Sequence, residues 1–269
     1  MSNLIHPSAV IDSKAEIGKQ VEIGPFVSIH GDVVIGDNTK IMQGAFIGKG
    51  ARIGSGCTIH PYAIISNTPQ DLKYKEIDTT FEVGDNTVIR EFATLHRGTE
   101  HSLKSKVGKN CFIMAYAHIA HDCFVGDNTI ISNSVQMGGH CVIGNFVNIG
   151  GLTAIHQFSK IADYCMVGGH RGVNKDIPPF SLCAGEPLVW AKVNIIGLRR
   201  RNFSSEQIST IESVYKTLYF SGLMVSHAVK EIKDSFDMTE EVKMIVDFIE
   251  KSKRGIIRSI ANRNTSRLE

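Results

Sequence analysis

Four polar residues of a type that performs acid–base chemistry lie close together in the middle of the chain: His118, His121, Asp122 and His140. An imidazole can take a proton from a hydroxyl near neutral pH, and a carboxylate beside it can orient the ring for that role. The same side chains are also ligands for zinc. Their types therefore indicate a catalytic base or a metal site, and the choice depends on how the chain positions them.

A strict six-residue repeat predicts the element that positions these residues. Between residues 5 and 173, taken in steps of six, there are 29 positions, of which 27 are Ile, Val, Leu or Met and the first eleven are all Ile. Such a period is typical of a parallel β-helix built from hexapeptide turns. If three hexads make one triangular coil, residues i and i+18 stack at the inter-strand spacing of about 4.8 Å.

The repeat also predicts which side chains point inward. With the aliphatic position called slot one, slot five holds small residues that share the interior. Five of the six cysteines occupy slot five, and we expect buried thiols there, not disulfides or a nucleophile; they are Cys57, Cys111, Cys123, Cys141 and Cys165. Glycine is frequent in slot two, where we expect corners with unusual backbone angles.

The polar cluster falls outside slots one and five, so we expect its side chains to face outward. Stacking places His121 under Gly139, Gly139 under Gln157, and Asp122 under His140. A histidine beside a glycine can pair a general base with an oxyanion donor, because a missing side chain lets a carbonyl approach the backbone N–H. The alternatives are solvated surface residues and a zinc site, which two subunits could share.

Two polar stretches interrupt the aliphatic series. Residues 66–82 place Asp71 on it and residues 96–106 place His101 on it. We expect both stretches to be loops that project from the prism, where functional residues often lie. Tolerated surface insertions are the alternative.

The repeat ends after Val173, and a helical pattern follows. Ser204 with Gln207 resembles a capping box, and Asp237 with Glu240 marks a second helix start. Apolar residues then recur at spacings of three and four: Ile208, Ile211, Val214, Tyr215, Leu218, Val242, Ile245, Val246 and Ile249. We therefore predict a mainly β protein, with a β-helix over residues 1–190 and a small α-helical domain over residues 191–269 that caps the stack.

The composition argues against several classes of function. The 269 residues carry a net charge of +2, which gives no indication of a nucleic-acid or membrane partner. Neither a signal peptide nor an apolar run of membrane-spanning length is evident. We expect a soluble, cytoplasmic protein.

Seven motifs resemble the UDP-N-acetylglucosamine O-acyltransferases of lipid A biosynthesis, over essentially the whole chain. They are QDLKY (70–74), LHRGT (95–99), AHIAHDCFVGDN (117–128), GGHCVIG (138–144), GGLTAIHQF (150–158), VNIIGLRRRNFS (193–204) and RGIIR (254–258). The resemblance implies a left-handed parallel β-helix and a homotrimer with active sites between neighbouring prisms. It also implies transfer of a 3-hydroxyacyl group from acyl carrier protein to the 3-hydroxyl of UDP-N-acetylglucosamine.

The resemblance further implies roles for single residues. His121 is the general base, Asp122 orients it, and the N–H of Gly139 holds the oxyanion. The substrate-binding residues that it implies are Gln70, Asp71, Lys73, His118, His140, His156, Gln157, Asn194, Arg200 and Arg201. It implies no metal, no cofactor beyond the phosphopantetheine of the carrier protein, and no acyl-enzyme, since a thioester is already activated.

Three positions bear on specificity. Gly169 matches a position that limits acyl length by side-chain bulk, so we expect a longer acyl chain than ten carbons. Ile196 stands where some family members carry a glutamate near the uridine, and the segment 185–194 also departs from the family pattern. Both departures concern the nucleotide and not the catalytic group.

Three other functions remain open from the sequence. A sister enzyme N-acylates a UDP-3-O-acyl-glucosamine on the same scaffold, and an amino-substituted acceptor would likewise give an amide product. A hydratase of the γ-carbonic anhydrase type would use the histidines as zinc ligands. A non-catalytic binding solenoid would leave the alignment of His121, Asp122 and Gly139 without a role.

Overall fold

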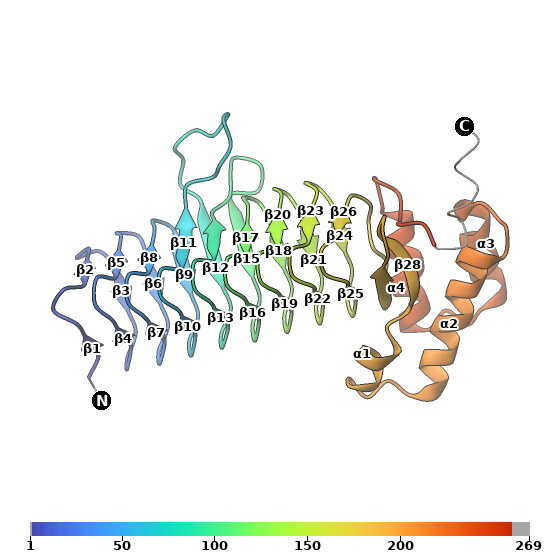
Figure 1. Cartoon of the computed structure of the whole chain (residues 1–269), viewed down its shortest axis with the longest axis horizontal. Coiled ribbons are helices and arrows are strands. Elements are labelled where there is room, and N and C mark those ends of the chain that lie inside the picture. Colours follow the sequence, from blue (N-terminus) through green and yellow to red (C-terminus); the bar gives the residue numbers. More distant parts are fainter. Residues whose placement is uncertain (1, 260–269) are drawn as a thin grey trace.

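The six-residue repeat forms a left-handed parallel β-helix in the computed structural model, which describes residues 2–259 (Figure 1). Within the coils, each strand pairs with the strand three places later in the chain, so that the short strands build three sheets. Sheet A contains β1 (Leu4–Ile5), β4 (Glu22–Ile23), β7 (Lys40–Ile41), β10 (Thr58–Ile59), β13 (Val88–Ile89), β16 (Phe112–Ile113), β19 (Ile130–Ile131), β22 (Asn148–Ile149), β25 (Met166–Val167), β27 (Ser181–Ala184) and β28 (Val189–Val193).

The other two sheets complete the triangular prism. Sheet B contains β2 (Val10–Ile11), β5 (Ser28–Ile29), β8 (Phe46–Ile47), β11 (Ile64–Asn67), β14 (Thr94–His96), β17 (His118–Ile119), β20 (Gln136–Met137), β23 (Ala154–Ile155) and β26 (Gly172–Val173). Sheet C contains β3 (Glu16–Ile17), β6 (Val34–Ile35), β9 (Ala51–Ile53), β12 (Thr80–Val83), β15 (Lys104–Val107), β18 (Phe124–Val125), β21 (Val142–Ile143) and β24 (Lys160–Ile161). We name the edges of the prism after the sheets that meet there.

Stacking at i+18 is confirmed outside the two interruptions, as in the pair Ile5 and Ile23. Across the interruptions the partners lie 30 residues apart at Ile59 and Ile89 and 24 residues apart at Val83 and Val107. Both values are multiples of six, so the aliphatic series stays in phase on either side.

The prism interior is filled as the repeat predicts. Slot-one residues such as Ile59 and slot-five residues such as Ala63 and Cys57 are fully buried. All six cysteines are buried free thiols, and Cys183, which lies outside the repeat, is among them. A cysteine in slot five therefore packs as a small apolar residue.

The prediction that unusual backbone angles explain the glycines in slot two is wrong. Positive φ angles occur in slot four, mostly at other residue types, such as Asp122 (φ 57°) and His140 (φ 61°). A slot-two glycine lacks room instead: a Cβ at Gly84 would lie 2.5 Å from the carbonyl carbon of Gly108 on the next coil. Close approach between coils, and not a special backbone angle, requires glycine there.

Two segments project from the coils, residues 68–79 between β11 and β12 and residues 97–103 between β14 and β15 (Figure 1). Both are shorter than the stretches named from the sequence, because their ends extend the flanking strands. Their projections lie side by side on one part of the prism (Figure 1).

Four helices follow the β-helix: α1 (Ile195–Arg199), α2 (Ser205–Phe220), α3 (Val225–Ser235) and α4 (Glu240–Glu250). The capping box of Ser204 and Gln207 is confirmed at the start of α2. The start predicted at Asp237 is wrong by two residues, since Thr239 caps α4. The sequence reading missed α3, although its buried face is apolar. None of these helices within residues 2–259 has the length and apolar character needed to cross a membrane.

The helices pack on the C-terminal end of the prism. Trp190 of β28 stacks on Tyr215 of α2 with ring centroids 5.1 Å apart, and both side chains are buried. The boundary predicted at residue 190 falls within β28 and stays a prediction. Residues 260–269 of the predicted helical unit lie outside the described residues.

Candidate active site

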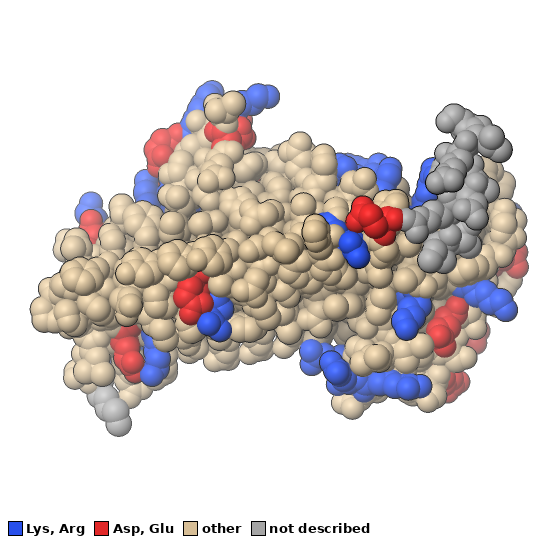
Figure 2. Space-filling model, in the orientation of Figure 1, with Lys and Arg blue, Asp and Glu red and all other residues tan. Residues whose placement is uncertain are grey.

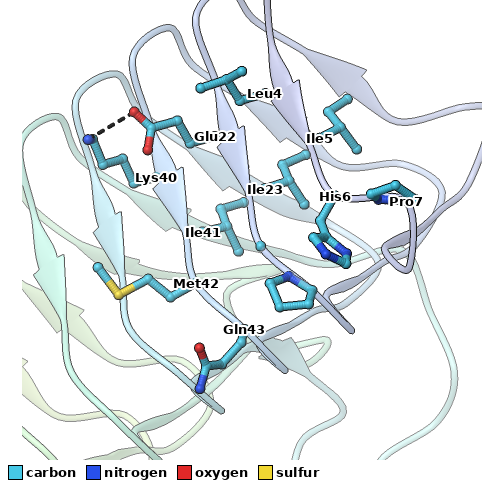
Figure 3. A pocket seen from close by; sticks show the side chains of 12 residues that line it. Leu4, Ile5, His6, Pro7, Glu22, Ile23, Lys40, Ile41, Met42 and Gln43 are labelled. Carbon is cyan, nitrogen blue, oxygen red and sulfur yellow. Dashed lines mark ion pairs between the residues drawn. The ribbon is translucent and has the colours of Figure 1, made fainter.

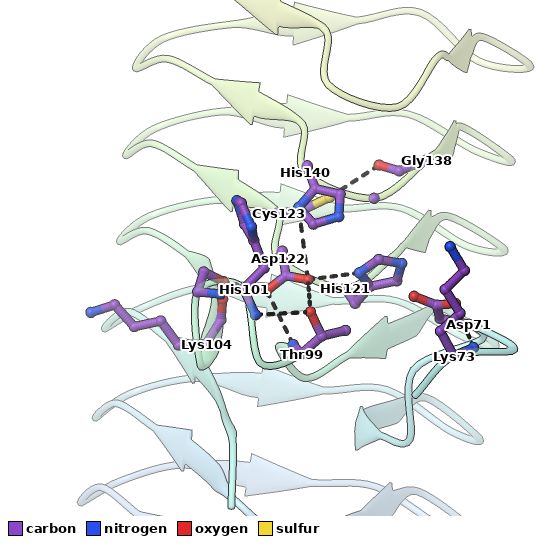
Figure 4. A network of polar contacts seen from close by, with 12 residues as sticks. Asp71, Lys73, Thr99, His101, Lys104, His121, Asp122, Cys123, Gly138 and His140 are labelled. Carbon is purple, nitrogen blue, oxygen red and sulfur yellow. Dashed lines mark hydrogen bonds and ion pairs between the residues drawn. The ribbon is translucent and has the colours of Figure 1, made fainter. Parts of the chain in front are cut away.

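The polar cluster lies at the B–C edge, where the chain turns from sheet B into sheet C. His121 and Asp122 occupy the turn between β17 and β18, and Gly139 and His140 occupy the equivalent turn one coil on. Figure 4 shows these side chains together on the outer surface of the coils, with Asp71 and Lys73 nearby. The hexad repeat places each residue in the turn, because slots three and four fall between strands in the coils without an interruption.

His121 and Asp122 form a hydrogen-bonded pair. Nδ1 of His121 lies 2.7 Å from Oδ2 of Asp122. A carboxylate can only accept, so Nδ1 carries the hydrogen and Nε2 keeps a free lone pair. This arrangement prepares His121 to accept a proton at Nε2.

Asp122 faces away from the prism interior, yet it is not exposed as expected: only 2% of its surface is accessible. Segment 97–103 covers it. The carboxylate accepts hydrogen bonds from the Thr99 N–H (3.1 Å), the Thr99 hydroxyl (2.7 Å), the Ser102 N–H (3.2 Å) and the Ser102 hydroxyl. No role was predicted for Thr99 or Ser102; both lie in an interruption of the repeat, and Thr99 also ends the LHRGT motif.

These contacts keep Asp122 ionised. Burial alone would disfavour the charged form, but the hydrogen bonds from His121, Ser102 and Thr99 outweigh it and hold the pKa of the Asp122 carboxyl well below its usual range. A permanently charged carboxylate stabilises the imidazolium that forms when His121 takes a proton.

Gly139 lies directly against the His121 ring. A Cβ at position 139 would lie 2.7 Å from Cε1 and 2.8 Å from Nε2 of His121. Within residues 2–259 the Gly139 N–H meets no hydrogen-bond acceptor. At another edge the slot-three amide is occupied by an acid one coil on, as where the Lys109 N–H donates to Asp127 Oδ1 at 2.8 Å. The Gly139 N–H is therefore free to bind an oxyanion beside the base.

Two more imidazoles flank His121. The His140 ring stacks on Phe158 with centroids 4.4 Å apart, and its centroid lies 5.0 Å from that of His121. Its Nδ1 is buried, has no hydrogen-bond partner among the described residues, and lies 3.8 Å from Asp122 Oδ2. Burial lowers the pKa of His140 and, with the nearby His121 and His101, outweighs the Asp122 and Asp71 carboxylates, which act in the opposite direction. The ring is thus neutral and keeps hydrogen-bonding capacity for a substrate.

His118 lies on the sheet B side of the same edge. Its Nδ1 is 2.9 Å from the Thr94 hydroxyl. Burial, followed by the nearby His96 and His121, lowers the pKa of His118 to about 4. A neutral His118 can donate or accept a hydrogen bond but does not serve as a second base near neutral pH.

A cavity of about 250 Å³ opens between the two projecting segments and His140. Asp71, Lys73, His101 and Phe158 line it, whereas Gln70 is exposed and is not among its lining residues. A second cavity, of about 480 Å³, lies on the sheet C side and includes Lys160, Lys253 and Arg254. His101, which was read only as a break in the repeat, lines both cavities and packs edge-on against His140 at 4.7 Å.

His156 and Gln157 lie on the same edge, one coil beyond Gly139. Both side chains are exposed, and His156 Nδ1 lies 3.0 Å from the Gln157 carbonyl and 3.3 Å from Arg254 Nη2. Their place agrees with the stacking arithmetic.

The remaining predicted site residues lie on other edges. Gly169 lies on the A–B edge, between β25 and β26. Arg201 packs over the ring of Phe146 on the C–A edge, 4.6 Å from its centroid, and Arg200 is the exposed C-cap of α1. Asn194 is 8% exposed and its side chain is already bonded to the Tyr164 carbonyl and the Gly197 N–H. None of these residues shares the edge of His121.

The zinc alternative has a geometric basis. One ligand atom each from His121, Asp122 and His140 lies within 4.8 Å of the others. An ion there would have to displace His121 from Asp122, whose oxygens already accept bonds from Thr99 and Ser102. The three side chains therefore fit a hydrogen-bonded network better than a metal site.

Another cavity lies away from the B–C edge. It measures about 540 Å³ and lies over β1, β4 and β7 at the N-terminal end of the prism (Figure 3). Its lining is mostly apolar, with a Glu22–Lys40 ion pair at 2.9 Å. It contains no pair of a base and its orienting acid, so the catalytic candidate stays at the B–C edge.

Comparison with known proteins agrees with this site. Residues 176–257 match the family described as UDP N-acetylglucosamine O-acyltransferase, domain 2, and residues 32–67 and 104–139 match the bacterial transferase hexapeptide family. The acyl-(acyl-carrier-protein)–UDP-N-acetylglucosamine O-acyltransferase of Halorhodospira halophila is 40% identical over 255 residues, which cover 94% of this chain and 99% of that protein. The protein of the same name from Paraburkholderia phymatum is 40% identical over 73% of this chain and 77% of its own length.

Solved structures agree over almost the full length. The structure of LpxA, a UDP-N-acetylglucosamine acyltransferase from Bacteroides fragilis, matches with a TM-score of 0.93 and 45% identity over 95% of this chain and 100% of that chain. LpxA from Acinetobacter baumannii matches with a TM-score of 0.92 and 40% identity over the same shares. The chain therefore belongs to the acyl-(acyl-carrier-protein)–UDP-N-acetylglucosamine O-acyltransferase family.

Proposed function

We propose that this protein transfers a 3-hydroxyacyl group from acyl carrier protein to the 3-hydroxyl of UDP-N-acetylglucosamine, the first step of lipid A biosynthesis. The observation that carries this proposal is the contact between the His121 ring and Gly139, whose N–H has no acceptor among the described residues. A base and an oxyanion donor side by side are the two groups that direct acyl transfer to a hydroxyl needs.

The reaction needs one proton transfer in each direction. His121 Nε2 takes the proton of the sugar hydroxyl while its oxygen attacks the thioester carbonyl. The tetrahedral intermediate places its oxyanion at the Gly139 N–H, and Asp122 stabilises the imidazolium. The intermediate then expels the phosphopantetheine thiolate, which receives the proton from His121. An ester forms, a thioester breaks, and no acyl-enzyme is needed; the buried cysteines play no part.

The cavities suggest where the substrates bind. Asp71, Lys73 and His140 line the smaller cavity and can bind the sugar hydroxyls, and the His140 ring lies 5.0 Å from that of the base. His118, His156 and Gln157 lie on the same edge and extend the polar surface on either side of the base. Gln70 is assigned to the same loop as Asp71 on resemblance alone.

We propose that the site is completed by neighbouring subunits of a homotrimer. Gly169, Asn194, Arg200 and Arg201 lie away from the edge of His121, with the packed interior in between. They can approach a sugar nucleotide at that edge only from another prism. An exposed aromatic ladder on the A–B edge offers an apolar contact surface, with stacked rings of Tyr62, Phe92 and Tyr116 that are 50%, 45% and 58% exposed.

The arginines near α1 suit phosphate groups and the acidic carrier protein. Figure 2 shows Lys and Arg side chains gathered on the underside of the molecule near the junction of the prism and the helices. Arg200 and Arg201 follow α1 directly and are exposed. A planar guanidinium can bind a phosphate through two parallel hydrogen bonds from different nitrogens, a geometry that the single ammonium nitrogen of lysine lacks. The cytoplasmic location expected from the sequence stays a prediction.

The decisive experiment is an acyl-transfer assay with 3-hydroxyacyl carrier protein and two acceptors, UDP-N-acetylglucosamine and its 3-amino analogue. We expect ester formation with the first, and loss of about 10²- to 10⁴-fold in His121→Ala, with the oligomer unchanged by sedimentation. His227→Ala, on the exposed side of α3, is the control. Full transfer by His121→Ala would exclude it as the base, and transfer to the amino analogue alone would favour an amino-substituted acceptor and an amide product.

The grouping of His121, Asp122 and His140 is the observation among the described residues that supports another reaction. Elemental analysis and an assay after chelation separate the two functions. Stoichiometric zinc, together with a hydratase activity that is lost on chelation, would favour the hydratase.

A further inference from the structure

The two projecting segments share one base. The Arg97 N–H donates to the Asn67 carbonyl at 3.1 Å, and the Gly98 N–H donates to the Thr80 carbonyl at 3.3 Å. Asn67 and Thr80 are the residues that flank segment 68–79, so the start of segment 97–103 binds both ends of the loop that carries Asp71 and Lys73. The loops that stand side by side in Figure 1 are thus joined through their backbones.

The Arg97 side chain extends this connection into the loop. It is 5% exposed, and its guanidinium donates to Glu76 Oε1 at 2.7 Å and to the Tyr74 hydroxyl at 3.0 Å and 3.3 Å. Its Nη1 also lies 3.5 Å from the Lys49 carbonyl. No Arg97 nitrogen is a buried atom without a partner among the described residues. A buried guanidinium is tolerated only when its donors are satisfied, so Tyr74 and Glu76 are held where Arg97 lies.

The other end of the same short segment holds the catalytic pair. Thr99 and Ser102 donate to Asp122, and Asp122 accepts from His121. Arg97 is two residues before Thr99, and Tyr74 is one residue after Lys73. The loop that lines the cavity is therefore hydrogen-bonded to Arg97, and the backbone from Arg97 to Thr99 connects it to the hydrogen bonds that hold the base.

We propose that Arg97 is a positioning residue, which holds the loop of Asp71 and Lys73 in register with the His121–Asp122 pair. Its role rests on the acyl transfer proposed above, because the loop is expected to bind the sugar nucleotide. Arg97 lines neither of the two cavities at the B–C edge. It acts through Tyr74 and Glu76, and the planar fork that reaches both is a property of arginine that lysine lacks.

The test measures KM and kcat separately for Glu76→Gln and Tyr74→Phe, which remove one partner of Arg97 each. We expect the KM for UDP-N-acetylglucosamine to rise about tenfold in Glu76→Gln, with kcat and the KM for the acyl carrier protein within about twofold. Asp78→Asn is the matched control on the same loop. It removes an ion pair with Lys49 at 2.7 Å whose acid is 88% exposed, and we expect unchanged kinetics.

A second measurement does not depend on turnover. Hydrogen exchange should become faster in residues 68–79 of Glu76→Gln and of Arg97→Lys, while the strands that flank the loop keep their protection. In Arg97→Lys we also expect kcat to fall, since the segment that carries Thr99 loses its anchor.

The outcomes are distinct. An unchanged KM and unchanged exchange in Glu76→Gln would overturn the role of Arg97 while transfer by the wild type stands. A fall of kcat in Glu76→Gln, with a raised KM for both substrates and a general loss of protection, would show that Arg97 is merely structural. Absence of transfer by the wild type would contradict the acyl transfer itself, and the exchange data would still report on the loop.

Discussion

His121 and Gly139 share one space: the imidazole lies where a side chain at position 139 would be, since a Cβ there would lie 2.7 Å from His121 Cε1 and 2.8 Å from Nε2. The contact joins two consecutive coils through the stacking of the repeat. It also sets the base beside a backbone N–H that has no acceptor within the described chain. Acyl transfer to a hydroxyl needs both groups at the same carbonyl.

Gly139→Ala should push the His121 ring from this position. We expect transfer to fall about 10²- to 10³-fold, comparable to loss of an oxyanion donor. The matched control is Gly172→Ala, because a Cβ at Gly172 meets nothing within 4 Å and its backbone angles suit alanine. Steady-state assays of acyl transfer compare the two variants. Equal activities would contradict the prediction that the His121 ring needs the absence of a side chain at position 139.

Asp122→Asn should lower kcat by about 10²- to 10⁴-fold, because an amide can donate to Nδ1 and so present His121 in the wrong tautomer. The control is Asp127→Asn, which alters an acid that accepts from the Lys109 N–H on another edge. We expect that variant to keep its activity within about twofold. An Asp122→Asn enzyme with wild-type kcat would show that the carboxylate serves only the covering loop.

His118 should make stability depend on pH. Burial lowers its pKa to about 4 in the fold, against about 6.5 in an unfolded chain. A group with a depressed folded pKa contributes stability that is present above the unfolded pKa, so this contribution is lost as the pH falls from about 6.5 to about 4.

We expect the unfolding free energy of the wild type to fall more steeply over this range than that of His118→Asn, by an amount on the order of 2 kcal/mol. Asparagine keeps an acceptor for the Thr94 hydroxyl but does not titrate. Urea titrations at one protein concentration measure the difference, with His227→Asn as the exposed control. Parallel curves for wild type and His118→Asn would assign the pH dependence to other groups.

The glycine at position 169 leads us to expect a donor with a long acyl chain. Its lack of a side chain leaves room, so fourteen-carbon 3-hydroxyacyl carrier protein should turn over faster than the ten-carbon donor. Gly169→Met should reverse this order by about tenfold or more, since a few methylene groups decide a hydrophobic fit. Competition between the two donors is the measurement. A wild-type preference for ten carbons would contradict the prediction.

Much of the architecture could be predicted because the repeat has a single period. A slot number determines whether a side chain points inward, which is why the burial of Cys57 and the stacking of His121 under Gly139 follow from counting. Counting failed where a distance between coils or a segment outside the repeat decides the structure. It gave the wrong reason for the slot-two glycines, placed the start of α4 two residues early and missed α3.

By itself, the sequence determined the prism, its interior and the coil on which each polar residue lies, because every coil repeats the same local geometry. Only the tertiary structure decided what surrounds the base. Thr99 and Ser102 cover Asp122, and Arg97 ties Tyr74 and Glu76 to the same segment. Those contacts join residues across loops whose paths no period describes. They depend on hydrogen bonds between segments that are distant in the sequence, and such bonds produce no periodic pattern of residue types.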